Sequence, residues 1–150
     1  MSGTGVRESV TILALPEQVR VARAFVAGVL GSSHGYADVA VLLASELVTN
    51  SVRHSGSAVP GGLVTVSVTT RGEDVRVEVT DGGGDGVPVL LPVSGEAEGR
   101  RGLRLVEALA ARWGYERGGG GPAMTWFELG QGCSGPADLA VPDVRGAARR

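Results

Sequence analysis

The sequence predicts an α+β two-layer sandwich, in which helices cover one face of a β-sheet. Two helical segments come before a run of strands, and a third helical segment is inserted between strands. Helices and strands that are segregated in this way pack as one layer against another. We expect one domain over residues 9–129, with a flexible N-terminus at 1–8 and a flexible tail at 130–150.

The first half of this domain is predicted to be mainly helical. A short apolar stretch at 9–15 is consistent with an edge strand, and Pro16-Glu17 then opens a helix that runs to about Leu30. The glycine- and serine-containing segment 31–35 ends that helix. A second helix is expected over 37–54, because glycine, serine and proline follow it.

The second half is predicted to be mainly strand. Valines alternate with polar residues over 64–68 and 75–79, which indicates an antiparallel hairpin with a turn at 71–74. The irregular stretch 82–100 is long for a small domain, and loops of that length are usually functional or disordered. A third helix is expected over about 102–112, and two strands over 113–117 and 123–129 close the domain.

The composition excludes several kinds of site. All 14 basic residues are arginine, and without lysine the chain has no Walker A loop, kinase-signature lysine or Schiff-base lysine. Its single cysteine, Cys133, excludes a cysteine-cluster metal site. A formal charge of −2 gives no case for binding nucleic acid or an anionic membrane. No signal peptide or run of about 18 apolar residues is found, so we expect a soluble cytoplasmic protein.

The predicted helix 37–54 has one stripe that begins apolar and becomes polar. At about 100° per residue, the stripe contains Val39, Leu43, Glu46, Asn50 and Arg53. A glutamate on such a stripe can accept a proton, and an amide oxygen one turn further suits Mg²⁺. Two interpretations are open: a pocket at this level of the helix, or an ordinary half-exposed helix with a solvated glutamate and asparagine.

Asp81 is expected at the end of a buried row of valines. Strand parity places its side chain on the same face as Val77 and Val79, and glycines 82–84 follow directly. A carboxylate there would suit an exocyclic amino group such as adenine N6, and the glycines would let a planar ligand approach the backbone. The alternative is a simple Asp-Gly turn without a ligand.

The start of the third predicted helix combines glycines with Arg100 and Arg101. Unpaired N–H groups and the helix dipole favour phosphate there, and an arginine adds a bidentate grip. The other interpretation of each arginine is a solvated surface residue. On the last strand, Thr125 shares the parity of Phe127, so its hydroxyl either faces a ligand inside the fold or belongs to an ordinary strand residue.

Four segments together resemble the ATPase superfamily shared by gyrase, histidine kinases, chaperone and mismatch-repair ATPases. They resemble most of all its small stand-alone members, related to the anti-sigma-factor serine kinases of actinomycetes. Residues 46–55 are similar to the N box of that family, 77–81 with the glycines to its first glycine box, 102–114 to the second, and 125–129 to the closing strand. The resemblance covers about residues 10–129.

The resemblance implies the Bergerat ATP-binding fold, a mixed and mostly antiparallel sheet covered on one face by three helices. It implies ATP and Mg²⁺ as cofactors, with Glu46 as the general base and Asn50 as the Mg²⁺ ligand. The remaining residues that it implies for the nucleotide are Arg53, Asp81, Gly83, Arg101, Gly102, Leu103 and Thr125. Among them, Asp81 would bind the adenine amino group, and segment 82–100 would form a lid over ATP.

The function implied is a serine/threonine protein kinase that acts as an anti-sigma factor. Its partners would be a sigma factor, a small anti-anti-sigma-type antagonist protein that it phosphorylates, or both; a homodimer is left open. The alternative is a partner-binding module of the same fold with little or no turnover. That alternative is motivated by Arg100, which replaces an expected glycine of the second box. A second departure from the family pattern is Asp85, which lies where the first box often has a second spaced glycine.

Overall fold

The computed structural model describes residues 5–54, 62–81, 105–117 and 123–130. Within these ranges the chain forms β1 (Val6–Leu13), a short 3-10 turn η1 (Pro16–Gln18), α1 (Val19–Leu30) and α2 (Ala37–His54). The strands β2 (Leu63–Arg71), β3 (Asp74–Asp81), β4 (Arg112–Arg117) and β5 (Ala123–Leu129) follow. Residues 105–109, before β4, are helical.

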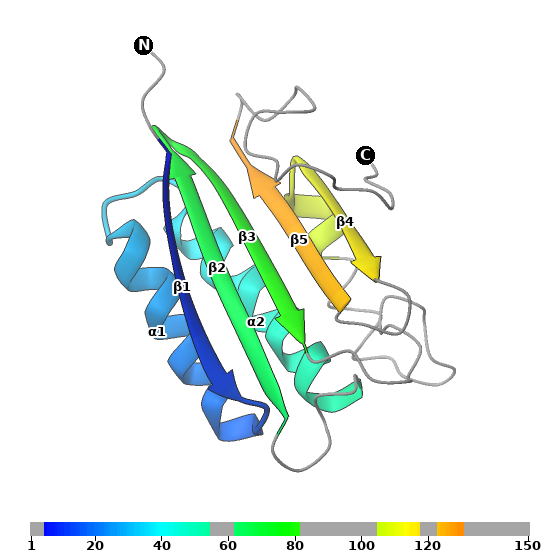
Figure 1. Ribbon diagram of the computed structural model, residues 1–150. Helices are drawn as coiled ribbons and strands as arrows, with labels where there is room; N and C mark the ends of the chain where they lie inside the picture. Colours follow the sequence, from blue (N-terminus) through cyan, green and yellow to red (C-terminus); the bar gives the residue numbers. More distant parts are fainter. Residues whose placement is uncertain (1–4, 55–61, 82–104, 118–122, 131–150) are drawn as a thin grey trace.

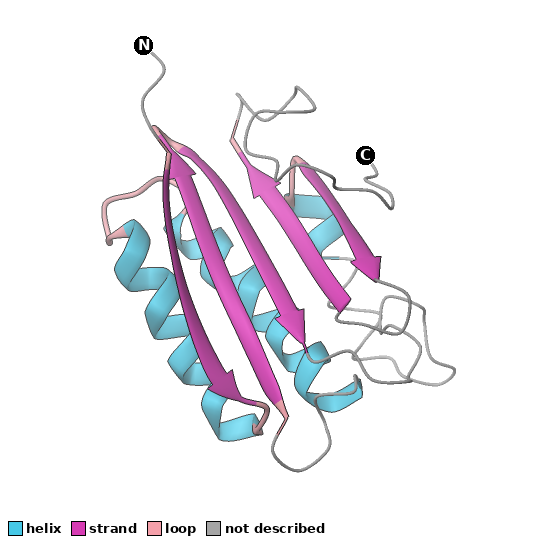
Figure 2. Cartoon of the chain, in the orientation of Figure 1, coloured by secondary structure: helices cyan, strands magenta, loops and turns pink. Residues whose placement is uncertain are grey.

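The five strands form a single sheet in the order β1-β2-β3-β5-β4, and every pairing is antiparallel. Helices α1 and α2 and the helix at 105–109 all lie behind this sheet in the view of Figure 1, and Figure 2 separates the two layers by colour. The predicted α+β two-layer sandwich is therefore confirmed.

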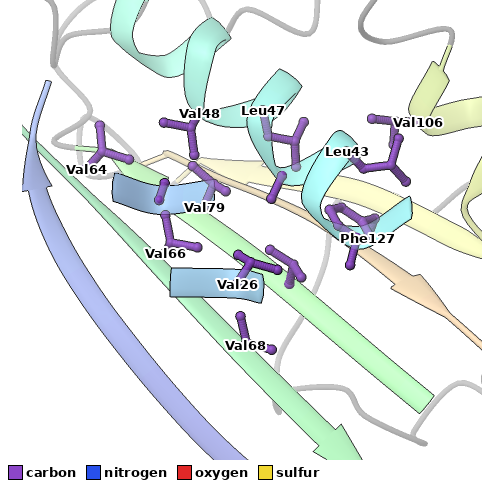
Figure 3. Packing of buried hydrophobic residues seen from close by; sticks show 14 of the residues in the cluster. Val26, Leu43, Leu47, Val48, Val64, Val66, Val68, Val79, Val106 and Phe127 are labelled. Atoms are coloured by element: carbon purple, nitrogen blue, oxygen red, sulfur yellow. The ribbon is translucent and has the colours of Figure 1, made fainter. Parts of the chain in front are cut away.

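The core lies between the helical layer and the sheet. The valines of β2 and β3 that share one strand face are fully buried, as the alternation predicts, and Leu43, Leu47 and Val48 of α2 pack on them (Figure 3). Burying each such side chain stabilises the fold by about 1.5–3 kcal/mol. Because α2 contacts both β2 and β3, the core fixes the helix across the middle of the sheet.

Several predicted boundaries differ from the structure. The helix predicted to open at Pro16 begins with a 3-10 turn, so that α1 starts at Val19, and β4 starts at Arg112, not at 113. The first strand covers Val6–Leu13, not 9–15, because its register with β2 runs from Val6 opposite Thr70 to Leu13 opposite Leu63. The last helical segment ends near Leu109, not at Arg112. There the backbone N–H of Ala111 donates to the carbonyl of Glu128 on β5 at 2.8 Å, which draws the chain into the sheet.

Candidate functional site

Helix α2 carries the first two candidate residues at the border of its buried face. The centre of that face is formed by small and apolar side chains, namely Ala40, Ala44 and Leu47, with Ser51 one turn further. Glu46 lies to one side and is half-buried, while Asn50 is nearer the centre and only 8% exposed. The polar stripe predicted from the sequence therefore flanks the core, and Glu46 keeps access to solvent.

Asp81 lies at the end of β3 on the face that the helices cover. It is opposite Val64 of β2 and Ala123 of β5, and it is 7% exposed. The parity argument is thus confirmed: the carboxylate continues the buried row formed by Val77 and Val79. A buried carboxylate requires polar partners, so its position at the rim of an apolar core is the most distinctive feature of this end of the sheet.

Thr125 lies on β5 beside that carboxylate. It is opposite Val79 and half-buried, so the side chains of Thr125 and Asp81 are diagonal neighbours on one sheet face. The expectation that Thr125 faces inward is confirmed. A hydroxyl and a carboxylate at this spacing can together accept and donate hydrogen bonds to one planar heterocycle.

The helix and strand residues converge on one end of the molecule. Helix α2 packs against β3, and in Figure 1 the arrowhead of β3 lies beside the C-terminal part of α2. Glu46 and Asn50 are one turn apart on that part of the helix, and Asp81 ends the strand. The site thus combines a half-exposed carboxylate, a buried amide and a buried carboxylate.

Other predicted residues are peripheral or lie outside the described part of the chain. Arg53 is near the C-terminus of α2 and its side chain is exposed. Gly83, the segment 82–100, Arg101, Gly102 and Leu103 are outside the described residues. The helix that follows them is represented by residues 105–109, with Val106 fully buried in the core.

The donor atoms of the site fit a hard cation supported by other ligands. Within residues 5–54, 62–81, 105–117 and 123–130, no three His, Cys, Asp or Glu side chains are grouped to hold a metal ion. The amide oxygen of Asn50 and the carboxylate of Glu46 are nevertheless oxygens of the kind Mg²⁺ prefers, and Mg²⁺ commonly takes most of its ligands from water and phosphate. The described residues therefore fit a nucleotide-bound ion better than an all-protein metal site.

No described helix is long and apolar enough to cross a membrane.

Comparison with protein families identifies one match over most of the chain. The family model described as a histidine kinase-like ATPase domain matches residues 12–126. This range includes all five candidates on α2, β3 and β5, namely Glu46, Asn50, Arg53, Asp81 and Thr125. No curated protein matches the chain.

Comparison with solved structures gives the same fold. The crystal structure of the RsbU and RsbW domains of Rv1364c from Mycobacterium tuberculosis matches with a TM-score of 0.59 and 24% sequence identity. The match covers 83% of this chain and 32% of that one, so the chain spans about a third of the length of the structure that it resembles. At this identity the likeness concerns the fold.

Proposed function

The chain belongs to the histidine kinase-like ATPase family, and on that premise we propose that it is an ATP-dependent serine/threonine protein kinase acting as an anti-sigma factor. Membership of an ATPase family implies ATP binding. The kinase activity and its partners, a sigma factor and a small antagonist protein with a target serine, are our proposal. The similarity of the fold to a structure that contains an RsbW domain is in keeping with it.

The observation that carries the proposal is the buried carboxylate of Asp81 beside Thr125, with Asn50 and Glu46 on the helix packed against the same strand. In our proposal Asp81 accepts the adenine amino group, and Thr125 completes the adenine contact. A buried carboxylate that is paired by the ligand discriminates strongly against a base without the matching donor. Gly83 would lie close to the base.

The phosphates would be held at the start of the third helix. We assign this role to the backbone N–H groups of Gly102 and Leu103 and to the side chains of Arg101 and Arg53, on the sequence resemblance and the general affinity of helix N-termini for phosphate. Asn50 would supply one oxygen to Mg²⁺. ATP, when bound, supplies the γ-phosphoryl group.

The chemical step that the chain itself performs is proton removal. Glu46 is half-buried, so its carboxylate is accessible to a serine hydroxyl presented by a partner protein. As general base it would take the hydroxyl proton as that oxygen attacks the γ-phosphorus of ATP, whose bond to the bridging oxygen breaks and releases ADP. Orientation and electrostatic stabilisation by the surrounding N–H groups and arginines would supply most of the remaining acceleration.

Nucleotide titration tests the binding half of this proposal. The wild-type chain should bind ATP more tightly with Mg²⁺ than without it, and Asp81→Asn should weaken ATP binding. Asp38→Asn is the matched control, because Asp38 is exposed in the first turn of α2, at the opposite end of that helix from Asn50. If the wild-type chain binds no ATP with Mg²⁺, or if Asp81→Asn binds ATP as tightly as the wild-type chain, the proposal is wrong.

The second candidate is a partner-binding module that regulates transcription by sequestration with little turnover. Arg100, at a position where the family usually has glycine, favours this interpretation. Glu46→Ala separates the two functions. Phosphoserine that mass spectrometry detects on the antagonist protein after reaction with the wild-type chain, but not after reaction with Glu46→Ala, supports the kinase. Unchanged partner binding with no phosphoserine even for the wild-type chain supports the module.

A further inference from the structure

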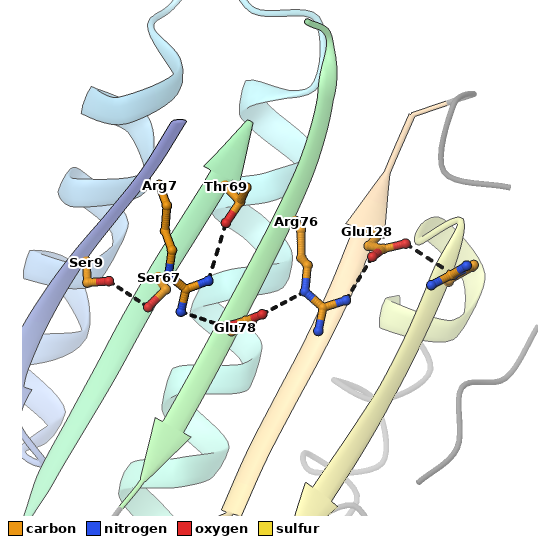
Figure 4. Close-up of polar contacts among 8 residues, drawn as sticks. Arg7, Ser9, Ser67, Thr69, Arg76, Glu78 and Glu128 are labelled. Atoms are coloured by element: carbon orange, nitrogen blue, oxygen red, sulfur yellow. Dashed lines mark hydrogen bonds and ion pairs between the residues drawn. The ribbon is translucent and has the colours of Figure 1, made fainter. Parts of the chain in front are cut away.

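A row of alternating charges crosses the sheet on the face opposite the helices (Figure 4). Arg76 of β3 donates from Nε to Glu78 at 2.7 Å and from Nη1 to Glu128 of β5 at 2.8 Å. The row continues outward on both sides, with Arg7 Nη2 2.9 Å from Glu78 and Arg112 Nε 3.1 Å from Glu128. We call these five residues the charge row.

The centre of the charge row is removed from solvent. Arg76 and Glu128 are 0% exposed and Glu78 is 3% exposed. The guanidinium carbon of Arg76 also lies 4.3 Å from the centroid of the Trp126 ring, a cation–π distance. Sequence reasoning missed this row. The signal that could have found it is the parity of the charged residues, which alternate with the valines of β3 and with the apolar residues of β5.

The register between β3 and β5 must be fixed by contacts between side chains. The two strands are not joined by a hairpin, since residues 82–122 lie between them, so no tight turn fixes their pairing. A slip by one residue would turn Phe127 and Leu129 out of the core and is excluded by the apolar alternation. A slip by two residues preserves that alternation.

The charge row excludes the slip by two residues. In the observed register Glu128 is directly opposite Arg76 on one side and Arg112 on the other. A shift of β5 by two residues along β3 would place Glu128 opposite Asp74 in one direction and opposite Glu78 in the other. Either shift replaces the cation–anion pair by a pair of like charges, which is destabilising.

We propose that Arg76 is a positioning residue for the nucleotide site, because its pairing with Glu128 fixes the register that places Thr125 beside Asp81. In the observed register Thr125 is opposite Val79 and therefore diagonal to Asp81; a two-residue slip would bring it either directly opposite Asp81 or opposite Val77, and neither keeps the diagonal spacing. The role at the nucleotide rests on the function proposed above. The role in register does not depend on it.

The test compares three variants by two measurements. Arg76→Met/Glu128→Met removes both charges and leaves no buried charge of this pair unpaired, and Arg76→Lys keeps a cation opposite Glu128. Arg7→Met is the matched control, because Arg7 is in the same row, half-exposed, and lies on the edge strand β1, which pairs with β2 and is not adjacent to β5. Cross-strand nuclear Overhauser effects report the register, and dissociation constants for ATP and GTP report the site.

Loss of the Arg76–Glu128 pair should change both measurements. In the double variant we expect contacts between β3 and β5 that are displaced by two residues, and a preference for ATP over GTP reduced by at least about tenfold. Arg76→Lys and Arg7→Met should keep the wild-type contacts and preference. A double variant with wild-type contacts and preference, or one that has lost affinity for both nucleotides equally in the wild-type register, overturns the proposal.

If the double variant does not fold, the Arg76→Lys variant provides the test. If the lysine variant changes register or preference although its cation is retained, the proposal is overturned, and if both are retained it is supported. A wild-type chain that binds no ATP contradicts the proposed function alone, since the cross-strand contacts still decide what sets the register.

Discussion

Glu128 lies on β5 and forms ion pairs with two arginines, while its neighbours in the strand, Phe127 and Leu129, point into the core. It pairs with Arg76 and Arg112, and it is 0% exposed. Glu128→Ala should therefore lower the free energy of unfolding by about 3–5 kcal/mol, since it breaks two ion pairs and leaves Glu78 as the single carboxylate of the charge row for its three arginines. Urea denaturation measures the change. Glu8→Ala, at an exposed position of β1, should alter stability by less than about 0.5 kcal/mol.

Gly130 has a backbone conformation and a close neighbour that both require glycine. Its φ is +123°, and a Cβ there would overlap the carboxylate of Asp74 and lie 3.0 Å from the Asp74 Cα, so no side-chain rotation relieves the contact. Gly31, at the end of α1, also has a positive φ of +86°, but a Cβ at that position would meet only open space.

The two glycines therefore form a matched pair of substitutions. Gly31→Ala should cost about 1–3 kcal/mol for the backbone alone, because a φ of 86° with a ψ of 150° lies in a region that essentially only glycine adopts. Gly130→Ala should cost clearly more, because the overlap with Asp74 adds to the same backbone term. Equal losses for the two variants in denaturant melts would contradict the contact between Gly130 and Asp74.

At the scale of the secondary-structure elements, the start of α2 depends on His34. Its Nδ1 accepts the backbone N–H of Tyr36 at 3.0 Å, and its carbonyl accepts the N–H of Ala37. His34→Ala should lower stability by about 1 kcal/mol, as the loss of a helix cap does. His34→Asn should retain most of it, because asparagine makes the same bond to the N–H two residues on. An Asn variant as unstable as the Ala variant would show that the ring matters through packing instead.

The helices and strands also show which features of the fold can be predicted from local sequence patterns. The helix 37–54 and the parity of Asp81 and Thr125 follow from local periodicity and agree with the structure. The end of the last helix depends on a bond from Ala111 to Glu128, and the charge row depends on β5 lying between β3 and β4. Both are contacts between residues distant in the chain, which periodicity does not encode.

The candidate site likewise has one part that could be predicted from sequence patterns and one part that could not. The half formed by Glu46, Asn50, Asp81 and Thr125 could be predicted, since each residue lies on a regular element whose faces the sequence defines. Gly83 and residues 101–103 lie outside the described residues, and the sequence around them has no repeating pattern that predicts the direction of a side chain. Their roles rest on family resemblance and remain predictions.

At the scale of the whole molecule, a ligand that binds only the folded chain must stabilise it. ATP at about 100 times its dissociation constant should add about 2.7 kcal/mol to the free energy of unfolding, by mass action. The gain should depend on ATP concentration and should be smaller for GTP, since Asp81 is proposed to accept the adenine amino group.

Thermal unfolding of the wild-type chain, Asp81→Asn and Asp38→Asn, each with and without ATP and Mg²⁺, tests the central claim most directly. The nucleotide should raise the midpoint of the wild-type chain and of Asp38→Asn, and it should leave Asp81→Asn almost unchanged. An equal rise in all three proteins, or no rise in the wild-type chain, would contradict an adenine site at Asp81.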